Sequence, residues 1–226
     1  MPSQVEELLS ELHALASPEN VVGMAHYGIN THGTLGISIY ELRRIAKTVQ
    51  PSHELAEELW ASGIHEARIL ASYLERPDWV SEEQMERWVL DFDSWDVCDQ
   101  VVELFAGTPF AYAKVIAWSQ RTEEFVKRAA FALIAELAAH DKNASDEKMA
   151  QFFPVIVGQA TDGRNFVKKA VNWALRNIGK RNRELNRLAI ETARQIQQID
   201  DRTARWIATD ALRELTSEKR QKTFKA

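Results

Sequence analysis

The segment Phe125-Val126-Lys127-Arg128-Ala129 recurs as Phe166-Val167-Lys168-Lys169-Ala170, 41 positions later, with a single exchange of Arg for Lys. A repeat of this length, built from pairs of helices, is typical of HEAT-like α-solenoids. One helix of each pair lines a concave surface in such a stack. The repeat therefore predicts an all-α fold of this class, a curved right-handed stack of antiparallel helix pairs.

Capping and helix-breaking residues divide the rest of the chain into helices as well. Ser3 with Glu6 has the spacing of a capping box, and no segment shows the period-two alternation of a strand. We expect a single HEAT-like domain over residues 1–216 and a polar, basic, frayed tail over 217–226. The expected caps are Ser3, Ser38, Ser52, Ser81, Ser94 or Asp93, Thr122, Ser145 and Asp162.

Composition limits the class of protein. Apolar residues make up 45% of the 226 positions, which suits a folded core, and no apolar run is long enough for a transmembrane helix. The acidic N-terminus lacks the features of a signal peptide. The single cysteine, Cys98, excludes an internal disulfide and a cysteine metal site. We expect a cytoplasmic monomer without metal or cofactor.

Charge is unevenly distributed along the chain. Residues 54–103 have a net charge of −11 and residues 164–187 one of +7, although the whole chain has a net charge of −5. If the repeated basic residues line the concave surface, they form a groove suited to a phosphate backbone. The alternative is that these are ordinary solvated charges. The predicted DNA-binding residues on this basis are Lys127, Arg128, Lys168, Lys169, Arg176, Lys180 and Arg181.

The helix expected after residue 94 carries the candidate chemistry. Trp95 and Asp99 are four residues apart and so share one helical face. An aromatic ring and a carboxylate side by side can both stabilise a positive charge. The alternative is a core tryptophan beside a helix-start aspartate, the role that we assign to Asp96. We interpret the six histidines as surface or packing residues, and Trp60, Trp79, Trp88, Trp118 and Trp206 as core fillers.

Four segments, in order, resemble the AlkD family of DNA glycosylases, the HEAT-like DNA alkylation repair proteins. Trp95-Asp96-Val97-Cys98-Asp99 is similar to the family's Trp-Asp-x-x-Asp, and Met24-Ala25-His26-Tyr27 to its Met-Ala-x-Tyr. The segments 125–130 and 166–175 resemble two further family segments. The resemblance extends from residue 24 to about 215, which is nearly the whole chain.

The resemblance implies a function and assigns residues to it. It implies hydrolysis of the N-glycosidic bond of N3- or N7-alkylated purines in double-stranded DNA, without flipping of the base. Asp99 then corresponds to the catalytic carboxylate, with Trp95 and Trp173 as the active-site tryptophans. Arg128 corresponds to a phosphate contact, and Tyr27 to a side chain that reaches the cleft.

Two departures from the family pattern keep alternatives open. Known active members have a further tryptophan where this chain has Ser94, and they are basic overall. A second hypothesis is therefore a HEAT-like DNA-binding paralogue that recognises distorted duplex without cutting it. A third is a solenoid scaffold for a protein partner, which the basic segment 164–187 disfavours.

Overall fold

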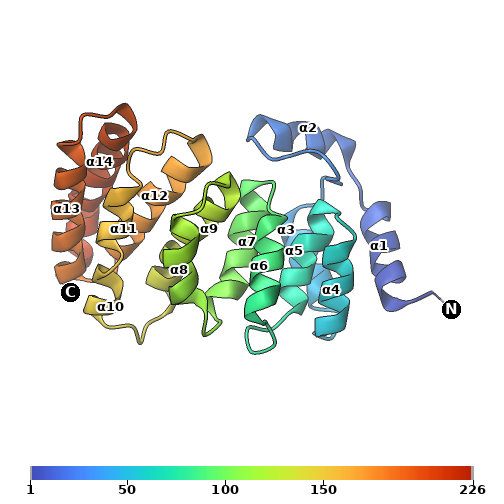
Figure 1. Cartoon of the computed structure of the whole chain (residues 1–226). Coiled ribbons are helices and arrows are strands. Elements are labelled where there is room, and N and C mark those ends of the chain that lie inside the picture. Colours follow the sequence, from blue (N-terminus) through green and yellow to red (C-terminus); the bar gives the residue numbers. More distant parts are fainter. Residues whose placement is uncertain (1, 225–226) are drawn as a thin grey trace. The chain divides into compact units, whose positions relative to one another are not determined.

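The structure is a computed structural model that describes residues 2–224 (Figure 1). These residues form fifteen helices and no strand, so the predicted all-α class is confirmed. None of these helices is long and apolar enough to cross a membrane. The chain divides into two compact units, Met1–Pro109 and Phe110–Ala226. The single HEAT-like domain predicted for residues 1–216 stays a prediction.

Seven helices build the first unit, and serine side chains cap five of them. Each of these serines accepts a hydrogen bond from an amide that the first helical turn leaves unpaired. The predicted capping box is complete, because Ser3 Oγ accepts from the Glu6 amide at 3.4 Å and the Ser3 amide donates to the Glu6 carboxylate at 2.8 Å. The helices are α1 (Gln4–Ala14), α2 (Pro18–His26), α3 (Ile39–Ala46), α4 (His53–Ala61), α5 (His65–Leu74), α6 (Glu82–Leu90) and α7 (Trp95–Ala106).

The core of the first unit is centred on α5. Eight of its ten residues are buried, and α3, α4 and α7 pack around it. The rings of Trp60 and Trp88 stack with centroids 4.1 Å apart beside this core. The prediction that Trp60, Trp88 and Trp118 are core residues is confirmed, since each is at most 5% exposed. It is wrong for Trp79 and Trp206, which are 39% and 40% exposed.

A buried carboxylate organises the loop between α2 and α3. The Glu66 carboxylate on α5 accepts hydrogen bonds from the amides of Leu35 at 2.8 Å, Gly36 at 2.7 Å and Ile37 at 3.2 Å. Gly36 has φ +84°, and a β-carbon there would lie 2.2 Å from the Ser17 carbonyl oxygen, so only glycine fits. The side chain of Glu66 thus fixes the path of the chain past α2.

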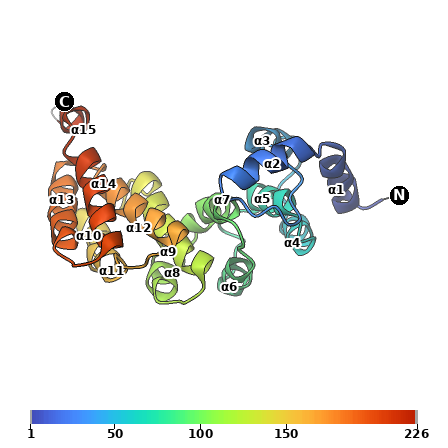
Figure 2. The same cartoon turned by 90° about the horizontal axis from the view of Figure 1, so that it is seen from above.

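Eight helices build the second unit, and its core is centred on α9. Eleven of the seventeen residues of α9 are buried, and α8 and α12 pack against it. Figure 2 shows α13 and α14 running beside each other in this unit. The helices are α8 (Ala111–Ser119), α9 (Glu124–His140), α10 (Asp146–Ala150), α11 (Phe153–Gly158), α12 (Asn165–Ile178), α13 (Arg183–Gln197), α14 (Arg202–Leu215) and α15 (Glu218–Thr223).

The two copies of the repeated segment occupy equivalent places on α9 and α12. Phe125 and Phe166 are each the second residue of their helix, and their ring centroids lie 5.6 Å apart. One guanidinium nitrogen of Arg128 donates to the Phe166 carbonyl at 2.8 Å. Residues that match along the sequence therefore touch in space, as expected for successive units of a solenoid.

Two helix starts differ from the prediction. The cap of α9 is Glu123 and not Thr122, and the cap of α12 is Arg164 and not Asp162. Asp162 instead accepts hydrogen bonds from the Arg164 amide at 3.1 Å and the Arg164 side chain at 3.0 Å. The Asp162 carboxylate therefore binds Arg164 and does not cap α12. A charged guanidinium is a stronger donor than the neutral amides of the first helical turn.

The C-terminal segment also differs from the expected frayed tail. Glu218–Thr223 forms α15, and Ser217 Oγ accepts a hydrogen bond from the Arg220 amide at its start. Two contacts join this segment to α13: Gln221 donates to Asn186 at 2.9 Å, and Arg183 donates to the Phe224 carbonyl at 2.7 Å. The last two positions of the predicted tail lie outside the described residues.

The two units have opposite net charges. Met1–Pro109 contains 19 Asp and Glu against 6 Lys and Arg, whereas Phe110–Ala226 contains 14 against 22. The net charges are therefore −13 and +8. The mildly acidic whole chain conceals a strongly basic second half, which carries every predicted DNA-binding residue except Tyr27.

Candidate functional site

The first unit brings Tyr27 and Trp95 together. Trp95 is the first residue of α7, and its indole nitrogen donates to the Tyr27 carbonyl at 3.2 Å. The Trp95 side chain is half-buried, whereas Tyr27 is 74% exposed. This contact ties the end of α2 to the start of α7, two elements that are far apart in the sequence.

A largely apolar pocket of about 560 Å³ lies beside these two residues. Its walls come from α2, the loop after it, the start of α3, α5 and α7. Helix α2 covers it without burying any residue of its own. The apolar and aromatic lining includes Met24, Tyr27, Ile37, Ile69 and Trp95.

A buried ion pair contributes to the polar lining of the pocket, and sequence reasoning missed it. His65 Nε2 lies 2.9 Å from Asp96 Oδ2, and the two residues are 4% and 9% exposed. Ser94 donates its hydroxyl proton to the other Asp96 oxygen at 2.6 Å and accepts from the Asn30 amide at 3.2 Å. The departure from the family pattern at Ser94 was the available signal, because a serine there completes this network and a tryptophan cannot.

The two members of the pair shift each other's pKa. Burial alone would lower the pKa of His65, but the hydrogen bond to Asp96 and the charge of Asp96 outweigh burial and raise it. Burial alone would raise the pKa of Asp96, but His65 and the Ser94 hydroxyl outweigh it and lower it. Both shifts favour the ionised pair.

The pair should make stability depend on pH. A raised His65 pKa stabilises the fold below its ordinary value of 6.5, and this stabilisation is lost as the pH rises through the folded-state pKa. A lowered Asp96 pKa stabilises the fold above its ordinary value of 3.8 and is lost as the pH falls through the folded-state pKa. The pair therefore contributes most between these two ordinary values.

We expect His65→Gln to remove the loss of stability that the wild type undergoes as the pH rises through the pKa of His65. Urea denaturation at mildly acidic and mildly alkaline pH should show that the stability gap between wild type and variant narrows as the pH rises. His140→Gln is the matched control, because its side chain is 70% exposed. A gap of constant size would show that His65 does not titrate in this range.

Asp99 lies one helical turn after Trp95 on α7 and is half-buried. It does not line the apolar pocket, whose carboxylates are Glu19 and Asp96. Among residues 2–224, no group of three or more His, Cys, Asp or Glu side chains could hold a metal ion. Asp99 stays the predicted catalytic carboxylate, because it is four residues from Trp95 and so lies on the same helical face.

In the second unit, the basic residues of α9 have partners inside the protein. The Lys127 ammonium lies 2.7 Å from Gln159 Oε1 and 3.6 Å from the Asp162 carboxylate. Arg128 is 6% exposed and donates to a carbonyl of α12. Their predicted contacts to DNA would require these side chains to exchange partners.

The equivalent residues of α12 are more available. Lys169 is exposed and forms no ion pair within the described part of the chain. Lys168 is half-buried, and its ammonium lies 5.2 Å from the centroid of the Trp206 ring. Trp173, one turn after Lys169, is half-buried.

Further along α12, acidic residues of α14 neutralise the basic stripe. Arg176 and Lys180 both pair with Glu214, the second at 2.7 Å, and Arg176 also lies 3.9 Å from Asp210. The positive charge that the sequence places along α12 is thus compensated towards its C-terminal end.

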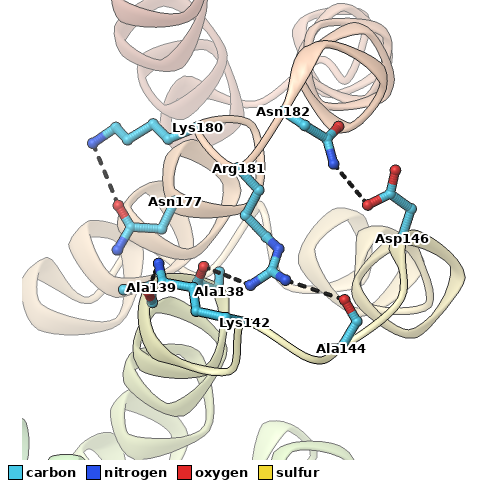
Figure 3. Close-up of a pocket in the computed structure, with 9 residues that line it drawn as sticks. All are labelled: Ala138, Ala139, Lys142, Ala144, Asp146, Asn177, Lys180, Arg181 and Asn182. Atoms are coloured by element: carbon cyan, nitrogen blue, oxygen red, sulfur yellow. Dashed lines mark hydrogen bonds between the residues drawn. The ribbon is translucent and has the colours of Figure 1, made fainter.

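Arg181 holds the end of α9, as Figure 3 shows. Its guanidinium donates to the carbonyls of Ala138 at 2.9 Å, Asp141 at 2.9 Å and Ala144 at 3.1 Å. These carbonyls belong to the last turn of the helix and the loop after it, which leave acceptors unpaired. Arg181 and Lys180 line a polar pocket of about 470 Å³ at this place.

One comparison with known proteins identifies a family. A family model described as "DNA alkylation repair enzyme" matches residues 8–215. No curated protein matches the sequence. The family match over residues 8–215 spans most of the chain and extends into both units.

One solved structure has the same fold. It belongs to a new family of proteins related to the HEAT-like repeat DNA glycosylases, with affinity for branched DNA structures. It superposes with a TM-score of 0.77 at 20% identity, and the alignment covers 94% of this chain and 95% of that one. A designed armadillo repeat protein aligns with a TM-score of 0.37 at 18% identity, over 77% of this chain and 92% of its own. The HEAT-like class is thereby confirmed by the first structure.

Proposed function

The chain belongs to the DNA alkylation repair enzyme family, and from this premise we propose that it is a DNA glycosylase for N3- and N7-alkylated purines in duplex DNA. The family match over residues 8–215 is the observation that carries the proposal. The basic second unit supports a polyanionic partner. In this proposal the protein acts as a cytoplasmic monomer without metal or cofactor.

The proposed chemistry needs an ionised carboxylate and no general acid. A purine alkylated at N3 or N7 is cationic and leaves without protonation, while positive charge develops on the deoxyribose. A fixed Asp99 carboxylate would stabilise that charge and orient the attacking water. Trp95 and Trp173 would contact the sugar and favour the cationic state. Contacts to sugar and backbone would suffice, so the reaction would not require base flipping.

Phosphate contacts would fix the register of the protein on DNA. We assign Lys168 and Lys169 as the most available of these contacts, followed by Arg128 and Lys127. Tyr27 would contribute from the first unit. Arg176 and Lys180 would first have to leave Glu214, and Arg181 is committed to backbone carbonyls, so we assign it no phosphate contact.

Duplex binding should weaken steeply with salt, because bound phosphates release counterions. We expect Lys169→Ala to reduce the slope of log affinity against log salt by about 0.9, the contribution of one phosphate contact. Lys47→Ala, which removes an exposed lysine of the acidic unit, is the control and should leave the slope unchanged. The measurement is fluorescence anisotropy of a labelled duplex over a salt series. Equal slopes for all three proteins would remove Lys169 from the interface.

A non-catalytic DNA-binding function is the second candidate. Ser94 stands where active members have a tryptophan, and it is buried in the hydrogen-bond network of Asp96. The related solved structure comes from a family described by its affinity for branched DNA. This candidate predicts binding to DNA junctions without release of any base.

Base release from methylated duplex DNA separates the two candidates. The purified protein is incubated with the duplex, and free 3-methyladenine and 7-methylguanine are quantified. Release above the spontaneous rate supports the glycosylase. Junction binding without release would transfer the assignment to the second candidate.

A further inference from the structure

A cleft of about 390 Å³ opens in the second unit where α12 and α14 begin. Its lining combines an aromatic ring, two basic side chains and the short residues between them. The lining residues are Gly163, Lys168, Arg202, Thr203 and Trp206. Only Lys168 belongs to the residues that the sequence marked as DNA-binding.

Trp206 is exposed where a buried residue was expected. It lies on α14 with 40% of its surface exposed, and the Lys168 ammonium lies 5.2 Å from its ring centroid. This cation–π contact holds the ring beside the cleft. The exposed part of the ring is a flat apolar surface next to positive charge.

The nearby carboxylates contact other groups and form no ion pair with the basic side chains of the cleft. Asp162 binds Arg164, and Asp201 accepts hydrogen bonds from the first amides of α14 at 2.7 and 2.9 Å. Neither Lys168 nor Arg202 forms an ion pair with any described residue. This contrasts with the far end of the same two helices, where Asp210 and Glu214 neutralise the basic side chains of α12.

We propose that this cleft binds one unpaired nucleotide of DNA, with the base stacked on Trp206 and its phosphate held by Lys168 and Arg202. A base inside a duplex has both faces covered, so only an unpaired base can stack on the ring. The lysine side chain is flexible, and its ammonium can move from the ring to a phosphate. The inference rests on the proposed function only in that the partner is DNA.

The probe is a labelled duplex with a short single-stranded overhang, compared with the same duplex without it. We expect wild type to prefer the overhang, and Trp206→Leu to lower overhang affinity by roughly 5- to 150-fold, the range for loss of one stacked base. Affinity for the blunt duplex should change by about twofold or less, the size of effect expected for a site outside the contact. Leucine keeps the apolar contacts of the buried part of the side chain.

Trp79→Leu is the matched control. Trp79 is 39% exposed and has the Arg76 guanidinium 5.0 Å from its ring, but this arginine is paired with Asp78. The control should bind both probes like wild type. Equal behaviour of Trp206→Leu and Trp79→Leu would overturn the inference.

Two further variants test the cleft without removing the ring. Gly163→Leu introduces bulk where a β-carbon lies 3.6 Å from Thr203 Oγ1, and it should abolish the overhang preference. Arg202→Ala should reduce the salt slope on the overhang probe, whereas Arg205→Ala, which removes a guanidinium paired with Asp200 at 2.8 Å, should not. If wild type binds both probes and these variants leave the preference intact, only the inference fails. If wild type binds neither probe, the proposed function fails with it.

Discussion

Asp99→Asn should remove most base release while leaving the fold and the DNA affinity nearly intact. Asparagine matches aspartate in size, so the packing of α7 changes little. It carries no charge, and so it cannot offset the positive charge that develops on the sugar, and it is a poor acceptor for the proton of an attacking water. Loss of one preorganised electrostatic contact typically lowers the rate by roughly 100- to 1,000-fold.

The assay is excision of 7-methylguanine and 3-methyladenine from methylated duplex, with DNA binding measured on the same preparations. Asp93→Asn is the matched control, because Asp93 is exposed and lies just before the same helix. Its carboxylate accepts a hydrogen bond from the Asn30 side chain at 2.8 Å. It should retain wild-type release. If Asp99→Asn releases bases as fast as wild type, another group must stabilise the cation.

Glu66→Gln should cause the largest loss of stability in the first unit. The Glu66 carboxylate accepts hydrogen bonds from three backbone amides, and the residue is 1% exposed. Glutamine offers one acceptor oxygen, and its amide nitrogen would face backbone donors. Hydrogen bonds to charged groups contribute about 1.5 to 3 kcal/mol each, so we expect a loss of about 3 kcal/mol or more.

Urea denaturation measures the loss, and hydrogen exchange locates it. The amides of Leu35, Gly36 and Ile37 should exchange much faster in the variant, whereas amides at the core of α9 should be unaffected in the native state. Glu58→Gln on α4 removes an exposed carboxylate and should change stability by less than about 0.5 kcal/mol. Unchanged exchange at the three amides would show that other contacts hold the loop.

Helix caps could be predicted from the sequence, because each depends only on residues within one turn of the helix. The caps at Ser3, Ser38, Ser52, Ser81 and Ser145 are each confirmed by a hydrogen bond to an amide three residues ahead. The repeat was predictable for the same reason, because equal sequences form equal helices. Their contact through Phe125 and Phe166 follows from stacking of successive repeats.

Features that depend on distant partners could not be predicted. His65 finds Asp96 after 31 residues, and Arg176 finds Glu214 after 38. Apart from Ser94 beside Asp96, the sequence near these residues does not mark the pairings, which arise only when the helices pack. The same limit explains Trp206, since the α14 pattern does not show that the cleft beside Gly163 leaves the ring open.

If the protein acts on DNA as proposed, the opposite charges of its two units would affect how it searches a chromosome. Attraction between basic side chains and phosphates is independent of sequence, so intact DNA competes with every damaged site. A chain that was basic throughout would spend most of its time on intact DNA. The 19 acidic residues of the first unit repel the same phosphates. In the proposed function, this repulsion would shorten residence on intact DNA, and each molecule would sample more of the genome in a given time. Long-lived binding would then occur only at sites where short-range contacts add to the long-range attraction.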